Sequence, residues 1–159
     1  MSSLFIRIDD RLIHGVVIQS WVRVLHIEHI IVADDRVAGD AMQKTLLLMA
    51  VPPSLKVSIF TVKETALKLK SGEFKKENVL VLVSNPTDAL ALVADGVAVE
   101  SINVGGLHFT PGKKQMLKTI SVDDKDIDAF CQINNLGVKL EVRVIPTDNS
   151  IDIMSCLKK

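Results

Sequence analysis

The chain has 159 residues, of which 48% are hydrophobic, and its 19 basic and 19 acidic side chains give a formal net charge of zero. This balance excludes the strong one-signed field of a nucleic-acid-binding or membrane-surface protein. No stretch reaches the ~18 uninterrupted apolar residues of a membrane span, and the N-terminus lacks the basic region of a signal peptide. We therefore expect a cytoplasmic protein with one domain over residues 1–159.

Short apolar runs alternate with helical patterns along the whole chain. Strands are predicted at residues 4–8, 29–33, 56–60, 78–83, 101–104, 117–122 and, as an edge strand, 139–145. Helices are predicted at residues 15–25, 40–50, 61–69, 86–96 and 123–136, with one or two further helical turns at 151–157. Repeated βα units with right-handed crossovers predict a doubly wound α/β fold, with an open, mostly parallel sheet and helices on both faces.

Two of the predicted helices carry clear start signals. Thr61 and Glu64 have the spacing of a capping box. Either Ser84 or Asn85 can cap the helix that begins at Pro86, because proline suits the first position of a helix. These signals place the junctions between strands and helices, where the carboxyl ends of parallel strands bind ligands.

Charged residues gather at the first of these junctions, in the sequence RIDDRLIHG. Strand alternation places Arg7 and Asp9 on the same face. A buried guanidinium is costly unless it meets an acid or an anion, so we expect Arg7 to pair with Asp9 or Asp10. Arg11 adds a second guanidinium to the same loop.

His14 stands where the first helix is predicted to begin. Free backbone N–H groups and the positive end of the helix dipole make such a position an anion site. A neutral imidazole there is a nucleophile toward a phosphoryl group held by Arg7, Arg11 and the backbone at Gly15. One of the two aspartates would bind the second ring nitrogen and fix the tautomer.

The same residues also have a plainer interpretation, as a structural ion-pair network with a histidine that caps a helix; spacing alone does not separate the two. A metal site built from His14, Asp9, Asp10 and His108 lacks any known ligand spacing, and the arginines would repel a cation. We therefore expect no metal and no organic cofactor.

Other polar positions lie at strand ends. Gly105 and Gly106 follow a short predicted strand, where backbone can approach a ligand closely, so this loop is expected to border the site. His108 lies just beyond them and is a weaker candidate for direct participation. His26 and His29 flank the second predicted strand and are interpreted as ordinary surface or turn residues.

The chain resembles the enzyme IIB subunits of the mannose/fructose/sorbose-type bacterial phosphotransferase system. The resemblance rests on RIDDRLIHG followed by Trp21, and on four further segments along the chain: IIVADDRVAGDAMQKTLLLMAVPP, VLVLVSNPTDAL, INVGGLHFTPGKKQ and GVKLEVRVIPTD. It implies an open sheet of about seven strands. It also implies a phosphocarrier that receives a phosphoryl group from a IIA protein or domain and passes it to a sugar held by membrane subunits IIC and IID.

Carried over by position, the resemblance makes His14 the phosphorylated residue, Arg7 and Arg11 the active-site arginines, and Asp9 and Asp10 the acidic pair. One departure is that Val16 stands where the family commonly has glutamine after the His-Gly pair. The resemblance is compatible with a homodimer and leaves the sugar open. The alternative is a non-catalytic binding or regulatory protein on the same fold.

Overall fold

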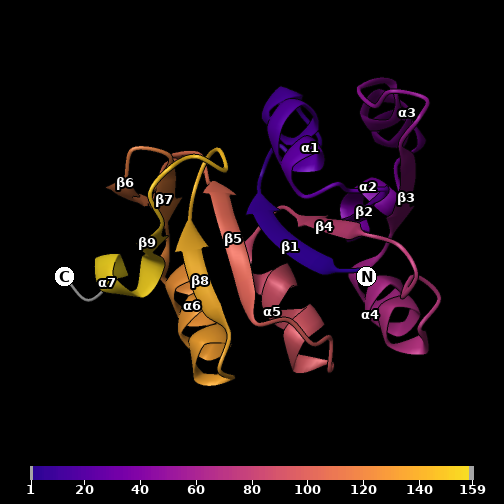
Figure 1. The fold of residues 1–159 in the computed structure, drawn as a ribbon. Helices are drawn as coiled ribbons and strands as arrows, with labels where there is room; N and C mark the ends of the chain where they lie inside the picture. Colours follow the sequence, from indigo (N-terminus) through magenta and orange to yellow (C-terminus); the bar gives the residue numbers. More distant parts are fainter. Residues whose placement is uncertain (1, 158–159) are drawn as a thin grey trace.

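The computed structural model describes residues 2–157 (Figure 1). Its strands are β1 (Leu4–Asp9), β2 (His29–Ala33), β3 (Lys56–Phe60), β4 (Val79–Val83), β5 (Ser101–Gly106), β6 (Lys114–Leu117), β7 (Ile120–Val122), β8 (Lys139–Val142) and β9 (Ile151–Asp152). Its helices are the π-helical turn η1 (Val17–Trp21), α1 (Val22–Val24), α2 (Asp35–Ala38), α3 (Ala41–Met49), α4 (Val62–Ser71), α5 (Pro86–Ala94), α6 (Asp124–Asn135) and α7 (Ile153–Leu157).

Seven strands form one sheet in the order β3-β2-β4-β1-β5-β8-β9. All neighbouring pairs are parallel except β8 and β9. The helices lie on both faces, with α1 and α3 on one side and α4, α5 and α6 on the other (Figure 1). The predicted doubly wound α/β fold is confirmed, and β1 occupies the middle of the sheet.

Each face of the sheet has its own apolar core. One core joins Val17 and Val37 to Leu80 and Leu82 of β4, while the other core contains Ala89 and Phe130 from α5 and α6. Every residue of β2 and β4 is buried, because both strands are covered on both faces. The long apolar run predicted at 78–83 therefore lies inside the sheet.

Both predicted helix caps are present, and the structure shows which of Ser84 and Asn85 caps α5. The Thr61 hydroxyl accepts the Glu64 N–H at 3.1 Å, while the Glu64 carboxylate accepts the Thr61 N–H at 3.0 Å. Asn85, and not Ser84, caps α5 by accepting the Asp88 N–H at 2.8 Å. Local side-chain chemistry thus sets where these helices begin.

Three details of the prediction are wrong. The strand predicted at 117–122 is instead the hairpin β6–β7, which pairs antiparallel outside the main sheet. The predicted edge strand 139–145 stops at Val142, and β9 takes the edge beside it. His29 is buried, with 7% of its surface exposed, because loop residues after α4 cover the start of β2.

Candidate active site

The site lies at the carboxyl end of β1, between β4 and β5. The loop from Asp10 to His14 leads into the helical segment that contains η1 and α1. Leu12 has a left-handed backbone with φ of 59°, which residues with a Cβ rarely adopt. The side chains of Leu12 and Ile13 are buried in the core beneath α1, and this packing holds the strained turn in place.

The Asp9 carboxylate is the centre of the site. It is fully buried, and its Oδ2 accepts hydrogen bonds from Arg7 at 3.0 Å and from His14 at 2.9 Å. Its Oδ1 accepts the backbone N–H of Arg11 at 3.1 Å. Burial raises the pKa of this carboxyl, but the bonds from His14 and Arg11 and the charge of Arg7 outweigh burial and hold the pKa below its ordinary value.

The hydrogen bond to Asp9 determines which nitrogen of the His14 ring carries a proton. An ionised carboxylate can only accept, so Nε2 of His14 carries the proton in this bond. Among residues 2–157, no hydrogen bond reaches Nδ1 of His14. The His14 side chain is 15% exposed. The ring is therefore anchored on one side and presents an unoccupied nitrogen, with its lone pair, on the other.

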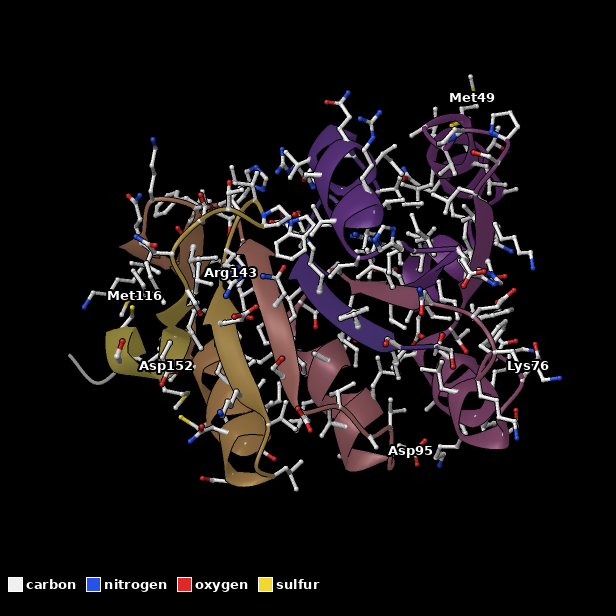
Figure 2. All side chains as sticks on the ribbon, viewed as in Figure 1. Met49, Lys76, Asp95, Met116, Arg143 and Asp152 are labelled. Atoms are coloured by element: carbon white, nitrogen blue, oxygen red, sulfur yellow. The ribbon has the colours of Figure 1, made fainter. Side chains whose placement is uncertain are left out.

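Arg7 is buried behind the carboxylate, with only 1% of its surface exposed. Its Nη1 donates to Asn103 Oδ1 at 2.5 Å and to the Arg143 carbonyl at 3.1 Å, and its guanidinium lies 5.3 Å from the Trp21 ring centre. Arg143 follows β8 at the same end of the sheet (Figure 2). Burial lowers the pKa of Arg7, and the neighbouring Asp9 partly offsets this. The contacts of Arg7 are thus structural supports for Asp9.

Arg11 and Gly15 are placed differently from Arg7. The Arg11 side chain is 47% exposed, with its Nε 3.7 Å from Asp9 Oδ1. Gly15 is exposed at the start of the helix, and apart from its chain neighbours and its own helix backbone, no atom of residues 2–157 lies within 4 Å of the place a Cβ would occupy. An anion beside His14 could therefore reach both a half-exposed guanidinium and open backbone at a helix N-terminus.

Asp10 does not contact His14. Its carboxylate accepts the His108 backbone N–H at 2.7 Å and bonds the His108 ring Nδ1 at 2.6 Å. The Asp10 N–H donates to the Gly106 carbonyl at 3.0 Å, so the Gly105–Gly106 segment borders the site as expected. The structure thereby separates the two carboxylates: Asp9 is bonded to the His14 ring, and Asp10 is bonded to His108 in the neighbouring loop.

A pocket of about 310 Å³ adjoins this cluster on the β5 side. Its lining includes Arg11, His108, Phe109 and Lys118. His108 and Phe109 are each 63% exposed. Cationic and aromatic side chains therefore line a pocket beside Arg11 and the Gly105–Gly106 segment. No group of three His, Cys, Asp or Glu side chains within residues 2–157 is arranged to hold a metal ion.

Sequence reasoning missed Asn103 and the contact between Gly105 and Arg7. Both residues belong to β5, far from Arg7 along the chain, and only the strand order brings them together. Asn103 did give a signal, because it is a polar residue in the short apolar strand SINV. Trp21 was noted as part of the resemblance, but its place over Arg7 could not be derived from spacing.

The model of the family described as "PTS system sorbose subfamily IIB component" matches residues 3–159. The chain belongs to this family. Among its relatives, the sorbose-specific EIIB component of Klebsiella pneumoniae is 40% identical over 148 residues, covering 93% of this chain and 90% of that protein. The mannose-specific EIIAB component of Escherichia coli strain K12 is 41% identical over 153 residues, covering 96% of this chain and 47% of that longer protein.

The solved structures agree with this assignment. The crystal structure of the IIBSor domain of the Klebsiella pneumoniae sorbose permease has a TM-score of 0.93 and 38% identity to this chain, covering 99% of it and 97% of that domain. The resemblance read from the sequence is confirmed. This IIB component is a phosphotransferase of the sorbose and mannose type, which takes part in sugar phosphotransfer. Within residues 2–157, no helix has the length and apolar content needed to cross a bilayer.

Proposed function

We propose that this IIB component is a cytoplasmic phosphocarrier that accepts a phosphoryl group on Nδ1 of His14 and passes it to a sugar during uptake. One observation carries the proposal. His14 holds Nε2 against Asp9 at 2.9 Å, while its Nδ1 has no partner among residues 2–157. A nucleophile needs an available lone pair and an orienting partner on its far side, and this ring has both.

The donor is a phosphohistidine of a IIA protein or domain. Support comes from the mannose-specific relative, whose name describes a combined EIIAB component. In this first transfer, the P–N bond in the donor breaks as a bond forms between phosphorus and Nδ1 of His14. The electron pair of the broken bond returns to the donor ring. His14 gains positive charge, which the buried Asp9 carboxylate stabilises through Nε2–H.

The acceptor is a sugar presented by membrane subunits IIC and IID, with which this component associates at the membrane periphery. The sugar hydroxyl attacks phosphorus, the Nδ1–P bond breaks, and the hydroxyl proton leaves to water. Asp9 keeps Nε2 protonated throughout, so the ring returns to its starting tautomer. A homodimer remains compatible with this scheme.

Arg7 and Arg11 stabilise charge in different ways. Arg11 is half-exposed and can meet phosphoryl oxygens, together with backbone at Gly15. Arg7 is buried, so its contribution is to the position and charge of Asp9. Because a carrier must release what it binds, one half-exposed guanidinium beside a carboxylate suits the task better than a closed ring of cations.

The test is phosphorylation by labelled phosphoenolpyruvate with enzyme I, HPr and IIA. The wild type and His14→Ala are compared with His108→Ala, a matched control because His108 is also bonded to an aspartate by one ring nitrogen. We expect an acid-labile, base-stable label on the wild type and on His108→Ala, and none on His14→Ala. Label on His14→Ala would show that a residue other than His14 is phosphorylated. An unlabelled wild type would favour a non-catalytic binding protein.

A further inference from the structure

A glycine of β5 lies directly against the Arg7 guanidinium. A Cβ built on Gly105 would stand 2.0 Å from Arg7 Nη2 and 2.1 Å from Cζ, far inside any real contact. Gly105 is not among the glycines with positive φ, so its backbone does not require glycine. The guanidinium occupies the space that a side chain at this position would fill.

The pairing of β1 with β5 explains this close approach. Arg7 lies opposite Asn103 and Ile8 opposite Val104, but Asp9 lies opposite Gly106. Gly105 is therefore the extra residue of a β-bulge. Bulges beside functional sites redirect side chains and bend the strand that contains them. Here the bulge leaves a space over Gly105 through which Arg7 reaches Asp9.

Asn103 fixes the other arm of the same guanidinium. Its Oδ1 accepts Arg7 Nη1 at 2.5 Å, and its Nδ2 donates to the Arg143 carbonyl at 3.2 Å. The Asn103 amide therefore cannot rotate without losing one of these bonds. Since Arg7 Nη2 bonds Asp9 Oδ2, the atom that also holds His14, the chain of contacts runs from β5 to the reactive ring.

We propose that Gly105 and Asn103 are positioning residues for phosphoryl transfer, acting through Arg7 and Asp9 to keep Nδ1 of His14 free. The role rests on the proposed function of His14. If Arg7 moves away, Asp9 Oδ2 keeps only the His14 bond and its side chain gains freedom to turn. The His14 ring then samples orientations in which Nδ1 is no longer the available nitrogen.

The neighbouring glycine provides a matched control. A Cβ on Gly106 would lie 3.6 Å from Asp9 Oδ1, an ordinary van der Waals contact. Gly106 also lacks a positive φ, so Gly106→Ala and Gly105→Ala differ mainly in the collision with Arg7. Both substitutions remove the same backbone freedom from the unfolded chain.

The experiment measures three properties of wild type, Gly105→Ala, Asn103→Ala and Gly106→Ala. They are the His14 tautomer from ring 15N chemical shifts, the rate of phosphorylation by IIA, and the ring nitrogen that carries phosphorus. We expect Gly105→Ala and Asn103→Ala to mix the tautomers and to lower kcat about tenfold or more with little change in KM, because small misplacements of a nucleophile are costly. Gly106→Ala should keep the wild-type tautomer and lose far less rate than Gly105→Ala, because its Cβ does not collide with Arg7.

A double-mutant cycle shows whether Gly105 acts through Arg7. In an Arg7→Ala background the guanidinium is gone, so adding Gly105→Ala should cause no further loss of rate. An unchanged tautomer and rate in Gly105→Ala and Asn103→Ala would overturn the proposal. The proposal would also be overturned if Gly105→Ala lowered the rate by the same factor in the wild type and in Arg7→Ala. The tautomer is measured without any transfer, so failure of this proposal stays distinguishable from failure of His14 as the carrier. If Gly105→Ala does not fold, Asn103→Ala carries the test, since it introduces no collision.

Discussion

Two histidine–carboxylate pairs lie at opposite ends of the sheet. His14 bonds Asp9 at 2.9 Å beyond the carboxyl end of β1, and His29 bonds Glu77 at 2.8 Å at the start of β2. Each carboxylate also meets a cation, Arg7 for Asp9 and Lys56 for Glu77. By composition the two pairs are alike, but their surroundings differ, and we propose a reactive role only for the His14 pair.

The two pairs differ in the second ring nitrogen of the histidine and in the cation that meets the carboxylate. Nε2 of His29 bonds Ser58 at 2.8 Å, and the ring packs edge-on against Phe74. Both nitrogens of His29 are engaged, whereas one nitrogen of His14 has no hydrogen-bond partner among residues 2–157. The cation of the His29 pair is the largely exposed Lys56, while the cation of the His14 pair is fully buried. A histidine–carboxylate bond thus holds both ring nitrogens of His29 within the fold together with Ser58, and it holds only one nitrogen of His14, the ring that we propose as the nucleophile.

The sharpest way to separate the pairs is to remove each histidine. We expect His14→Ala to abolish phosphorylation while the protein stays folded. His29→Ala should keep phosphorylation and lose about 2–4 kcal/mol of stability, because it removes the hydrogen bonds to the partly buried Glu77 and Ser58 and leaves a cavity. Labelling assays and thermal unfolding check both, with a Tm shift of roughly 2–4 °C per kcal/mol. A folded but unphosphorylated His29→Ala would break the comparison.

Replacing the two carboxylates should likewise affect the transfer rate only in the His14 pair. Asp9→Asn keeps the size of the side chain but can present an N–H to His14, which disturbs the tautomer. We expect transfer to fall by up to about 10⁴-fold, the scale seen when the catalytic histidine of a serine protease loses its orienting carboxylate. Glu77→Gln should leave the rate of transfer unchanged. Single-turnover transfer from IIA measures both, and equal rates in the two variants would contradict the assignment of roles.

As the pH falls, the His29–Glu77 pair should weaken before the His14–Asp9 pair. Hydrogen bonds from Lys56 and His29 hold the pKa of Glu77 below its ordinary 4.5, and the pKa of Asp9 lies below its ordinary 3.8. A carboxylate with a lowered folded pKa adds stability above its unfolded pKa and loses it as the pH falls through the folded value.

The stability difference between wild type and Glu77→Gln should therefore be complete at neutral pH and begin to shrink near pH 4.5, before that of Asp9→Asn begins to shrink near pH 3.8. Urea unfolding at a series of pH values checks the order. Differences that grow as the pH falls would contradict it.

The smallest expected effect concerns Ser58. Its hydroxyl occupies the second nitrogen of His29, so Ser58→Ala removes one partly buried hydrogen bond. We expect a loss of about 0.5–1.5 kcal/mol and no change in phosphorylation. Although this variant frees Nε2 of His29, no buried arginine supports that ring, so no label should appear there. Label on His29 in a Ser58→Ala, His14→Ala double variant would show that a free nitrogen alone is enough.

The sequence was sufficient to predict the central parallel strands β1 to β5 and most helix boundaries. Apolar runs such as Val79–Val83 have the period of buried parallel strands, and caps such as Thr61 and Asn85 act within three residues along the chain. The charged loop at the first junction was equally visible. Together with the resemblance to the IIB family, it was enough to select candidate site residues, namely His14, Arg7, Arg11, Gly15, Asp9 and Asp10.

Only the tertiary structure decided how those residues are connected. Strand order places β5 beside β1, so Asn103 and Gly105 meet Arg7 from nearly a hundred residues away, and the bulge in β5 gives Arg7 its route to Asp9. The same order sends Asp10 to His108 and leaves Asp9 for His14. Periodicity and capping are local, and they report which residues form strands and helices. Which nitrogen, carboxylate and guanidinium meet depends on contacts between distant segments, because only packing of the whole sheet brings those segments together.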